Sequence, residues 1–242
     1  MNIDKMTKIY NEITIFSNEL WNKIKKIDIE TKKNFKSEEN ILIQIKSNLK
    51  MIEFSLSNNL FWTIFNRKPF EERVIELKFN LLNIKINSSN LFTKLNWLIN
   101  LLSTHKKIKK EIINWIEKNI KKIDKIFENK KINNTNDKIK LLLWNLQRYY
   151  NNLKLSKKRI TIDLKTTEKN LIRLKDVKKK FEKLLIVLLN NKILNLLDEK
   201  IKILKKNNKK VQFNKVENEK FQNLNKIKKE LLNEINSSLK YI

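Results

Sequence analysis

The sequence predicts an all-α protein in which long, antiparallel, amphipathic helices form a helical bundle with coiled-coil-like packing. Three observations predict this fold class. Apolar residues recur every three or four positions along most of the 242 residues, which is the spacing of one helix face. One region keeps a seven-residue apolar repeat, which long helices packed side by side require. Glycine, whose freedom at positive φ tight hairpins use, is absent, and no stretch alternates long enough to predict a strand.

Two helices are expected before the single proline. An apolar stripe over residues 6–27 predicts the first of them. Glu38 and Glu39 follow a serine, and acidic side chains in a first turn are stabilised by the positive end of the helix dipole. A junction is therefore predicted near residues 34–37, followed by a second stripe over residues 42–64.

The third predicted helix begins at Pro69. Proline suits the first position of a helix, because its missing N–H would have no partner there. A break is expected near residues 66–68, and the seven-residue repeat then runs from Val74 to Leu102. Only Ser88 interrupts the apolar pattern of this repeat, and a kink is possible there.

Another helix is predicted after a junction near residues 104–106. Its stripe covers residues 108–127. The polar stretch 129–137 that follows predicts a loop.

The remaining chain predicts a second long helical region and a short terminal helix. The long region covers residues 139–204, with a break near Ser156 or Asn190. Residues 207–220 are polar and lack a period, which predicts a linker or a segment ordered only by a partner. A final amphipathic helix is expected over residues 221–242.

Charge is distributed unevenly along the chain. Residues 1–104 hold 16 Lys+Arg against 11 Asp+Glu, whereas residues 105–242 hold 38 against 15, which gives net charges of +5 and +23. We therefore divide the chain into a near-balanced helical region at 1–104, a basic helical region at 105–206, the polar linker and the terminal helix. The asymmetry favours a polyanionic partner for the second half, although a solvated and self-repelling surface is the alternative.

The composition also indicates the kind of genome that encodes the chain. Lysine, asparagine and isoleucine have A/T-rich codons and are abundant, so part of the lysine content reflects codon drift. Five tryptophans are present, which a code that reads TGA as tryptophan would explain, as in mitochondria and mollicute-like bacteria; retention for packing is the alternative. The N-terminus lacks signal- and transit-peptide features, and no ~20-residue apolar run predicts a membrane span. We expect an organelle matrix or a bacterial cytoplasm, not secretion.

Several classes of active site are excluded by composition. Without glycine the chain cannot form the glycine-rich loops that bind nucleotide phosphates, and without cysteine it has no thiolate nucleophile and no cysteine-bound metal. His105 is the only histidine and is expected in a loop or cap at the 104–106 junction. The acid pairs are adjacent in sequence and point about 100° apart on a helix, so we expect helix-start or solvent roles for them. These pairs are Glu38–Glu39, Glu71–Glu72 and Asp198–Glu199. We expect no enzyme activity, no cofactor and no metal.

Clusters of lysine and arginine supply the candidate site. Spaced along two long helices, they would form ladders of positive charge about 15–20 Å apart or more, which suit a phosphate backbone. Trp144, Arg148 and Tyr149 form the one basic–aromatic cluster where a base could stack, with core packing as the alternative for Tyr149. The candidate polyanion-binding residues are Lys106, Lys107, Lys109, Lys110, Lys121, Lys122, Arg148, Lys157, Lys158, Arg159, Lys178, Lys179, Lys180 and Lys183.

Three functions are compatible with these features. The first is a structural protein whose basic half binds RNA in a ribosome-like ribonucleoprotein. The second is a coiled-coil scaffold or accessory subunit that contacts only proteins, through its apolar stripes. The third is a peripheral protein on an anionic membrane. Because phosphate binding weakens steeply with salt and an apolar contact does not, salt dependence separates the first two.

Overall fold

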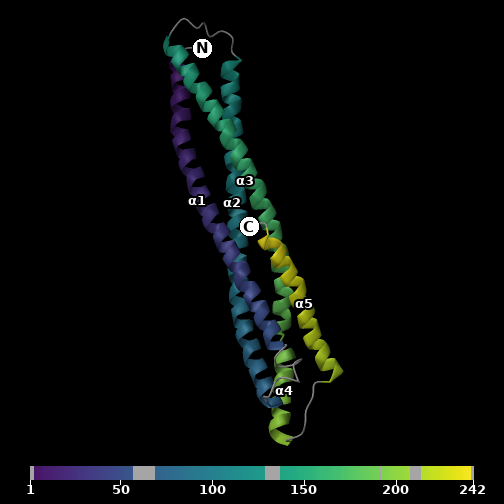
Figure 1. Cartoon of the computed structure of the whole chain (residues 1–242). Helices are drawn as coiled ribbons and strands as arrows, with labels where there is room; N and C mark the ends of the chain where they lie inside the picture. Colours follow the sequence, from purple (N-terminus) through teal and green to yellow (C-terminus); the bar gives the residue numbers. More distant parts are fainter. Residues whose placement is uncertain (1–2, 57–68, 129–136, 191, 208–213, 241–242) are drawn as a thin grey trace. The chain divides into compact units, whose positions relative to one another are not determined.

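Five helices account for nearly all of the residues that we describe, which are 3–56, 69–128, 137–190, 192–207 and 214–240 of a computed structural model (Figure 1). The helices are α1 (Ile3–Leu56), α2 (Phe70–Phe127), α3 (Asp137–Leu189), α4 (Lys192–Asn207) and α5 (Lys215–Leu239). No strand occurs in these ranges, so the predicted all-α helical bundle is confirmed. The antiparallel and coiled-coil details of that prediction stay predictions.

The chain divides into two compact units that interleave along the sequence. Unit 1 comprises residues 1–33 and 100–171, and unit 2 comprises residues 34–99 and 172–242. The sequence assigns 26 Lys+Arg and 12 Asp+Glu to unit 1, and 28 and 14 to unit 2, so each unit carries +14. The charge asymmetry along the chain is therefore not an asymmetry between units, and the regions drawn from it stay a prediction.

Two of the four predicted helix junctions are wrong. α1 continues through residues 34–37, and α2 continues through residues 104–106. At both places the apolar stripe is interrupted close to a unit boundary, where the chain of one helix leaves one unit and enters the other. A change in the packing partners of a helix disturbs its apolar stripe much as a turn does, and the sequence alone does not separate the two. Glu38 accordingly lies inside α1 and is buried, so its predicted helix-start or solvent role is also wrong.

The other predicted helix boundaries agree with the structure in part. Pro69 directly precedes α2, whose first turn holds the two glutamates expected there. The predicted break at 66–68 and all but the last residue of the loop predicted at 129–137 lie outside the described residues; that last residue, Asp137, is helical, so the loop ends one residue earlier than predicted. The break near Asn190 is confirmed by the end of α3 and the start of α4, whereas α3 passes through Ser156 uninterrupted.

The start of the last helix corrects the predicted linker at 207–220. α5 begins at Lys215, six residues earlier than expected, because Asn214 caps it. The Asn214 side chain accepts a hydrogen bond from the Glu217 N–H at 2.8 Å, and the Glu217 carboxylate accepts one from the Asn214 N–H at 2.8 Å. This reciprocal capping box satisfies two N–H groups that a helix start leaves unpaired. Residues 208–213 lie outside the described ranges.

Each unit has its own core of isoleucine, leucine and phenylalanine. In unit 1, Ile116, Ile123 and Leu146 are fully buried, and Trp115 and Tyr149 pack against them. The unit 2 core is larger and buries Leu42, Ile45, Leu49, Leu77, Leu81, Leu95, Leu174, Phe181, Phe221 and Leu231. Where the structure describes their side chains, the predicted stripes therefore largely face the cores, as their helical spacing requires.

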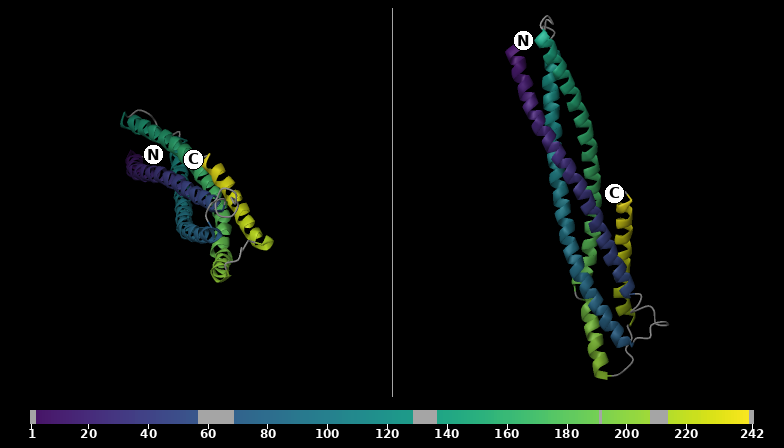
Figure 2. Two further views of the ribbon diagram at one scale, coloured as in Figure 1. Left: turned by 60° about the horizontal axis from the view of Figure 1, so that its bottom comes forward. Right: turned by 60° about the vertical axis from the view of Figure 1, so that its left-hand side comes forward.

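Ion pairs join α5 to α1, α3 and α4 within unit 2, whose helices are drawn in Figure 2. Lys180 of α3 forms an ion pair with Glu234 of α5, and Lys228 of α5 forms one with Glu53 of α1 at 3.3 Å. Lys78 of α2 pairs with Asp198 of α4. Lys200 of α4 also pairs with Glu217 of α5 at 2.8 Å, so these long-range ion pairs together link segments of all five helices within this unit.

Across the described ranges, no helix has both the length and the hydropathy needed to span a bilayer.

Candidate nucleic-acid interface

Beyond its first turn, where the exposed Asp137 pairs with Lys140 at 3.3 Å, the outer face of α3 in unit 1 carries basic side chains without acidic ones. Between Lys140 and Lys169, every exposed residue is basic, apolar or neutral and polar. The acids of this stretch, Asp163 and Glu168, are half-buried. We call the following exposed residues the α3 basic face: Lys140, Arg148, Lys154, Lys158, Arg159, Lys165 and Lys169.

A second row of exposed lysines follows α2 in the same unit. Glu111 is the one exposed acid between Thr104 and Lys125. From the first to the last lysine, the row spans about 27 Å at a rise of ~1.5 Å per residue. We call the row the α2 basic face; it consists of Lys107, Lys110, Lys118, Lys121, Lys122 and Lys125.

Ion pairs between α2 and α3 engage the two half-buried acids beside these faces, Glu117 and Glu168. Lys106 and Lys110 reach the Glu168 carboxylate at 3.0 and 3.7 Å, and Lys157 reaches Glu117 at 2.9 Å. The hydrogen bond from Lys106 is the main cause of the lowered pKa of Glu168, and the one from Lys157 is the main cause of the lowered pKa of Glu117. Both acids are thus held as carboxylates by lysines that lie between the helices.

Lys109 is buried and does not belong to a surface. Its ammonium donates to the Thr167 hydroxyl at 2.9 Å, and that hydroxyl donates to the Asp163 carbonyl at 2.8 Å. Only 2% of Lys109 is exposed. Although it belongs to a run of lysines, a phosphate cannot reach it without opening unit 1.

His105 is likewise buried, one turn from Lys109. Its Nε2 lies 3.3 Å from the Glu30 carboxylate of α1. Burial is the main cause of its lowered pKa, which Lys109 lowers further and Glu30 opposes. The predicted loop or cap position of His105 is wrong, because its partner carboxylate lies 75 positions away in the sequence and no local pattern reveals it.

The four candidate lysines of unit 2 lie in a different electrostatic setting. Lys180 is paired with Glu234, and Lys178 lies 5.7 Å from the centre of the Phe92 ring. Lys179 and Lys183 are exposed, but the exposed acids Asp176 and Glu182 lie on the same stretch of α3. This part of the helix therefore presents mixed charge.

Aromatic residues adjoin the α3 basic face. Trp144 is 59% exposed, and the Arg148 guanidinium carbon lies 5.8 Å from the centre of its ring. The Lys154 ammonium lies 4.2 Å from the centre of the Tyr150 ring. Tyr149 is partly buried against the unit 1 core, which fits the packing role left open for it. Trp144 and Arg148 thus offer an accessible flat surface beside positive charge.

Several lysines of these faces are absent from the sequence-based candidates. These lysines are isolated in the sequence, whereas the predicted candidates lie mostly in runs of basic residues. Steps of three, four or seven positions place residues on one helix face and would have found them. The lysines of the two faces that are absent from the candidates are Lys118, Lys125, Lys140, Lys154, Lys165 and Lys169.

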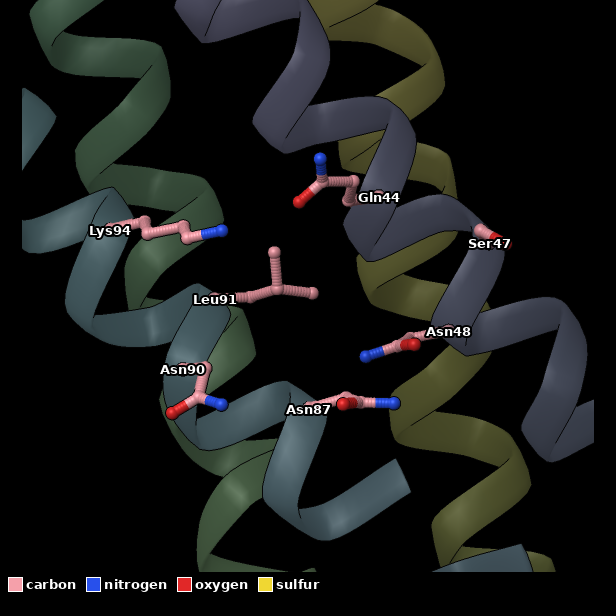
Figure 3. A pocket seen from close by; sticks show the side chains of 7 residues that line it. All are labelled: Gln44, Ser47, Asn48, Asn87, Asn90, Leu91 and Lys94. Carbon is pink, nitrogen blue, oxygen red and sulfur yellow. The ribbon is translucent and has the colours of Figure 1, made fainter. Parts of the chain in front are cut away.

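A shallow groove of about 270 Å³ lies between α1 and α2 in unit 2 (Figure 3). Amides and a hydroxyl dominate its lining, and Lys94 is its one charged residue. The lining residues are Gln44, Ser47, Asn48, Asn87, Asn90, Leu91 and Lys94. Across the described ranges, no three His, Asp or Glu side chains are grouped as metal ligands.

No protein family, curated protein or solved structure that was compared with this chain matches it.

Proposed function

We propose that this protein binds RNA without catalysing a reaction, as a helical structural component of a ribosome-like ribonucleoprotein. The observation that carries the proposal is the α3 basic face of unit 1, beside which Asp137 in the first turn of α3 is the one exposed acid up to Lys169. Lysine and arginine that neutralise phosphates release condensed counterions, and this release supplies most of the affinity of sequence-independent binding. The α2 basic face extends the positive surface of the same unit.

Composition favours backbone contact over base readout. Lysine outnumbers arginine by far, and lysine acts as a point charge, whereas arginine can pair bidentately with guanine. Trp144 and Arg148 add one place where an unpaired base can stack. We therefore expect weak dependence on base sequence and a preference for RNA that contains unpaired segments.

The proposed bundle is antiparallel, and contacts within unit 1 support that arrangement. Going up α2 from Lys106 to Glu117, the partner on α3 goes down from Glu168 to Lys157. Neighbouring helices of opposite direction give such a falling order, as in up-and-down bundles.

A peripheral membrane role is the second candidate, because apolar side chains are also exposed along α3. Leu141, Leu155 and Ile162 lie among the basic residues, and basic helices with exposed apolar side chains bind anionic lipid surfaces. Vesicles that contain anionic lipid, compared with neutral vesicles, separate this candidate from RNA binding.

The test measures RNA affinity of the full chain against salt. If about six to ten phosphates are neutralised, the affinity falls by roughly 10³–10⁵ between 50 and 200 mM salt. Neutralising four lysines of the α3 basic face to glutamine (Lys154, Lys158, Lys165 and Lys169) should reduce the slope of log affinity against log salt by about three to four. The control neutralises four exposed lysines of unit 2, namely Lys175, Lys179, Lys183 and Lys192.

A second pair of variants tests base stacking. Trp144→Ala should weaken binding to single-stranded RNA roughly tenfold or more, since a stacked base contributes ~1–3 kcal/mol. Trp97→Ala is the matched control, because Trp97 is 58% exposed but lies in unit 2.

Three results would contradict the proposal. If the two sets of lysine variants weaken RNA binding equally, the RNA-binding surface is not specific to unit 1. Absence of RNA binding at 50 mM salt would favour the scaffold function. Binding to anionic vesicles without binding to RNA would favour the membrane function.

A further inference from the structure

One face of α2 in unit 2 is exposed and uncharged, in a chain of which 33% of the residues are charged. From Ile75 to Thr93, every exposed residue of α2 is neutral. Phe79, Ile86 and Trp97 are each more than half exposed. We call the following residues the neutral face: Ile75, Phe79, Asn83, Ile86, Asn90, Thr93 and Trp97.

The spacing of the neutral face is that of a helix-pairing surface. Successive members are four, four, three, four, three and four positions apart. Such steps keep side chains in one line along a helix and define the seam between paired helices. From Ile75 to Trp97 the seam extends for about 33 Å at ~1.5 Å per residue. The sequence also uses this spacing on the inner side of α2, so the helix has one buried seam and one exposed seam.

The charges beside the neutral face are complementary to a second copy of the same face. Glu76 and Lys94 are 18 positions apart, which is about five turns at ~3.6 residues per turn, so they flank the same side of the seam. In an antiparallel pair related by a two-fold axis, the side of the seam that carries Glu76 and Lys94 in one copy meets the same side in the other copy. The two helices run in opposite directions. Glu76 of one copy then approaches Lys94 of the other, on both sides of the axis.

The apolar residues are also complementary when the axis passes through Ile86. Ile86 then meets Ile86 of the second copy, Ile75 lies opposite Trp97, and Phe79 lies opposite Thr93. In a parallel pair with a two-fold axis, by contrast, opposite sides of the two seams meet, so Glu76 of one copy and Lys94 of the other would lie on opposite sides of the interface and would not pair.

We propose that the neutral face of α2 pairs with the neutral face of a second copy, as an antiparallel two-fold dimer. The net charge of +28 opposes contact between copies elsewhere, and this uncharged seam is where that opposition is weakest. Asn87 and Lys94 lie between the seam and the groove of Figure 3, and Asn90 belongs to both, so these residues provide a polar rim of the kind that interfaces have.

Dimerisation and RNA binding respond to salt in opposite directions. Salt screens the repulsion between two positive copies but leaves apolar burial in place, so the dimer persists or tightens as salt rises. Phosphate binding weakens over the same range. The failure of one proposal is therefore distinguishable from the failure of the other.

Sedimentation velocity of the full chain over a concentration series tests the proposal. The mass should rise from 29.3 kDa to about twice that value. Ile86→Lys should keep the protein monomeric, because two ammonium groups would meet at the axis. Ile162→Lys is the matched control: Ile86 is 59% exposed and Ile162 is 56% exposed, but Ile162 lies on α3 of unit 1. Unchanged helical circular dichroism in both variants verifies that they fold.

Disulfide cross-linking tests the orientation, since the chain has no cysteine of its own. Ile86→Cys should cross-link to its own copy, and Phe79→Cys should cross-link only when combined with Thr93→Cys. Glu76→Lys should weaken the dimer, and the added change Lys94→Glu should restore it. A protein that is monomeric at all concentrations, a dimer that survives Ile86→Lys, or efficient cross-linking by Phe79→Cys alone would overturn the proposal.

Discussion

Replacing Glu38 with glutamine should stabilise the protein at neutral pH and leave it nearly unchanged in acid. Glu38 is 2% exposed in unit 2, and this burial raises the pKa of its carboxyl to about 7, against a weaker opposing effect of Arg173. Burial in a low-dielectric interior disfavours the charged form of a carboxyl. Glutamine keeps the shape of the protonated side chain and cannot ionise.

The size of the effect follows from linkage between protonation and folding. The difference between a pKa of about 7 in the folded chain and the ordinary 4.5 corresponds to about 3 kcal/mol, at ~1.36 kcal/mol per pH unit. Because the pKa is raised on folding, the stabilising protonation is fully present below pH 4.5 and is lost as the pH rises through 7. The advantage of the variant should therefore grow between these values and become constant above them.

Urea unfolding followed by circular dichroism at several pH values between 4 and 8.5 measures this advantage as a difference between variant and wild type. Glu39→Gln is the control, since Glu39 is the exposed neighbour of Glu38 on α1. If the Glu38→Gln variant and the wild type have unfolding free energies that stay parallel over the whole pH range, the carboxyl is not desolvated and our reasoning fails.

Two further predictions concern stability. Truncating a core leucine to alanine should cost roughly 2–5 kcal/mol, whereas the exposed Leu141 should cost well under ~1 kcal/mol by the same denaturation assay. The core positions to test are Leu81, Leu95 and Leu146. Lys228→Met should be neutral or stabilising, because Lys228 is buried while its partner Glu53 is largely exposed. Glu53→Gln should destabilise the protein, since it leaves the buried Lys228 ammonium without its carboxylate. Equal effects of Lys228→Met and Glu53→Gln on the free energy of unfolding would contradict this difference between the two partners.

The fold class follows from the sequence because helical periodicity is a local property. Residues three or four positions apart share a helix face whatever the rest of the chain does, so the stripes identified the core at Leu81, Leu95 and Leu146. Pro69 marks a real boundary because it acts on its own backbone. The junctions expected near 34–37 and 104–106 are wrong because the signal there comes from contacts with other helices, which local rules do not contain.

The candidate site was predictable only in part, for a related reason. Runs of lysine identify where charge is dense, but a helix turns about 100° per residue and distributes a run over several faces. Within the run from Lys106 to Lys110, one ammonium is buried, two pair with Glu168, and Lys107 is exposed. Exposure depends on which face the neighbouring helices cover, and that requires the fold. The burial of Glu38 and the pairing of His105 depend on the fold in the same way.

The interleaving of the two units limits how the gene can be divided. Every unit boundary falls inside a helix, and each unit needs two separate segments of the chain. A single cut at any position therefore leaves at least one unit without one of its segments, and the fragments 1–104 and 105–242 would each carry pieces of both. Neither unit can be expressed as one continuous fragment without a segment of the other unit. A stop codon or frameshift between residues 34 and 171 would therefore damage both units at once.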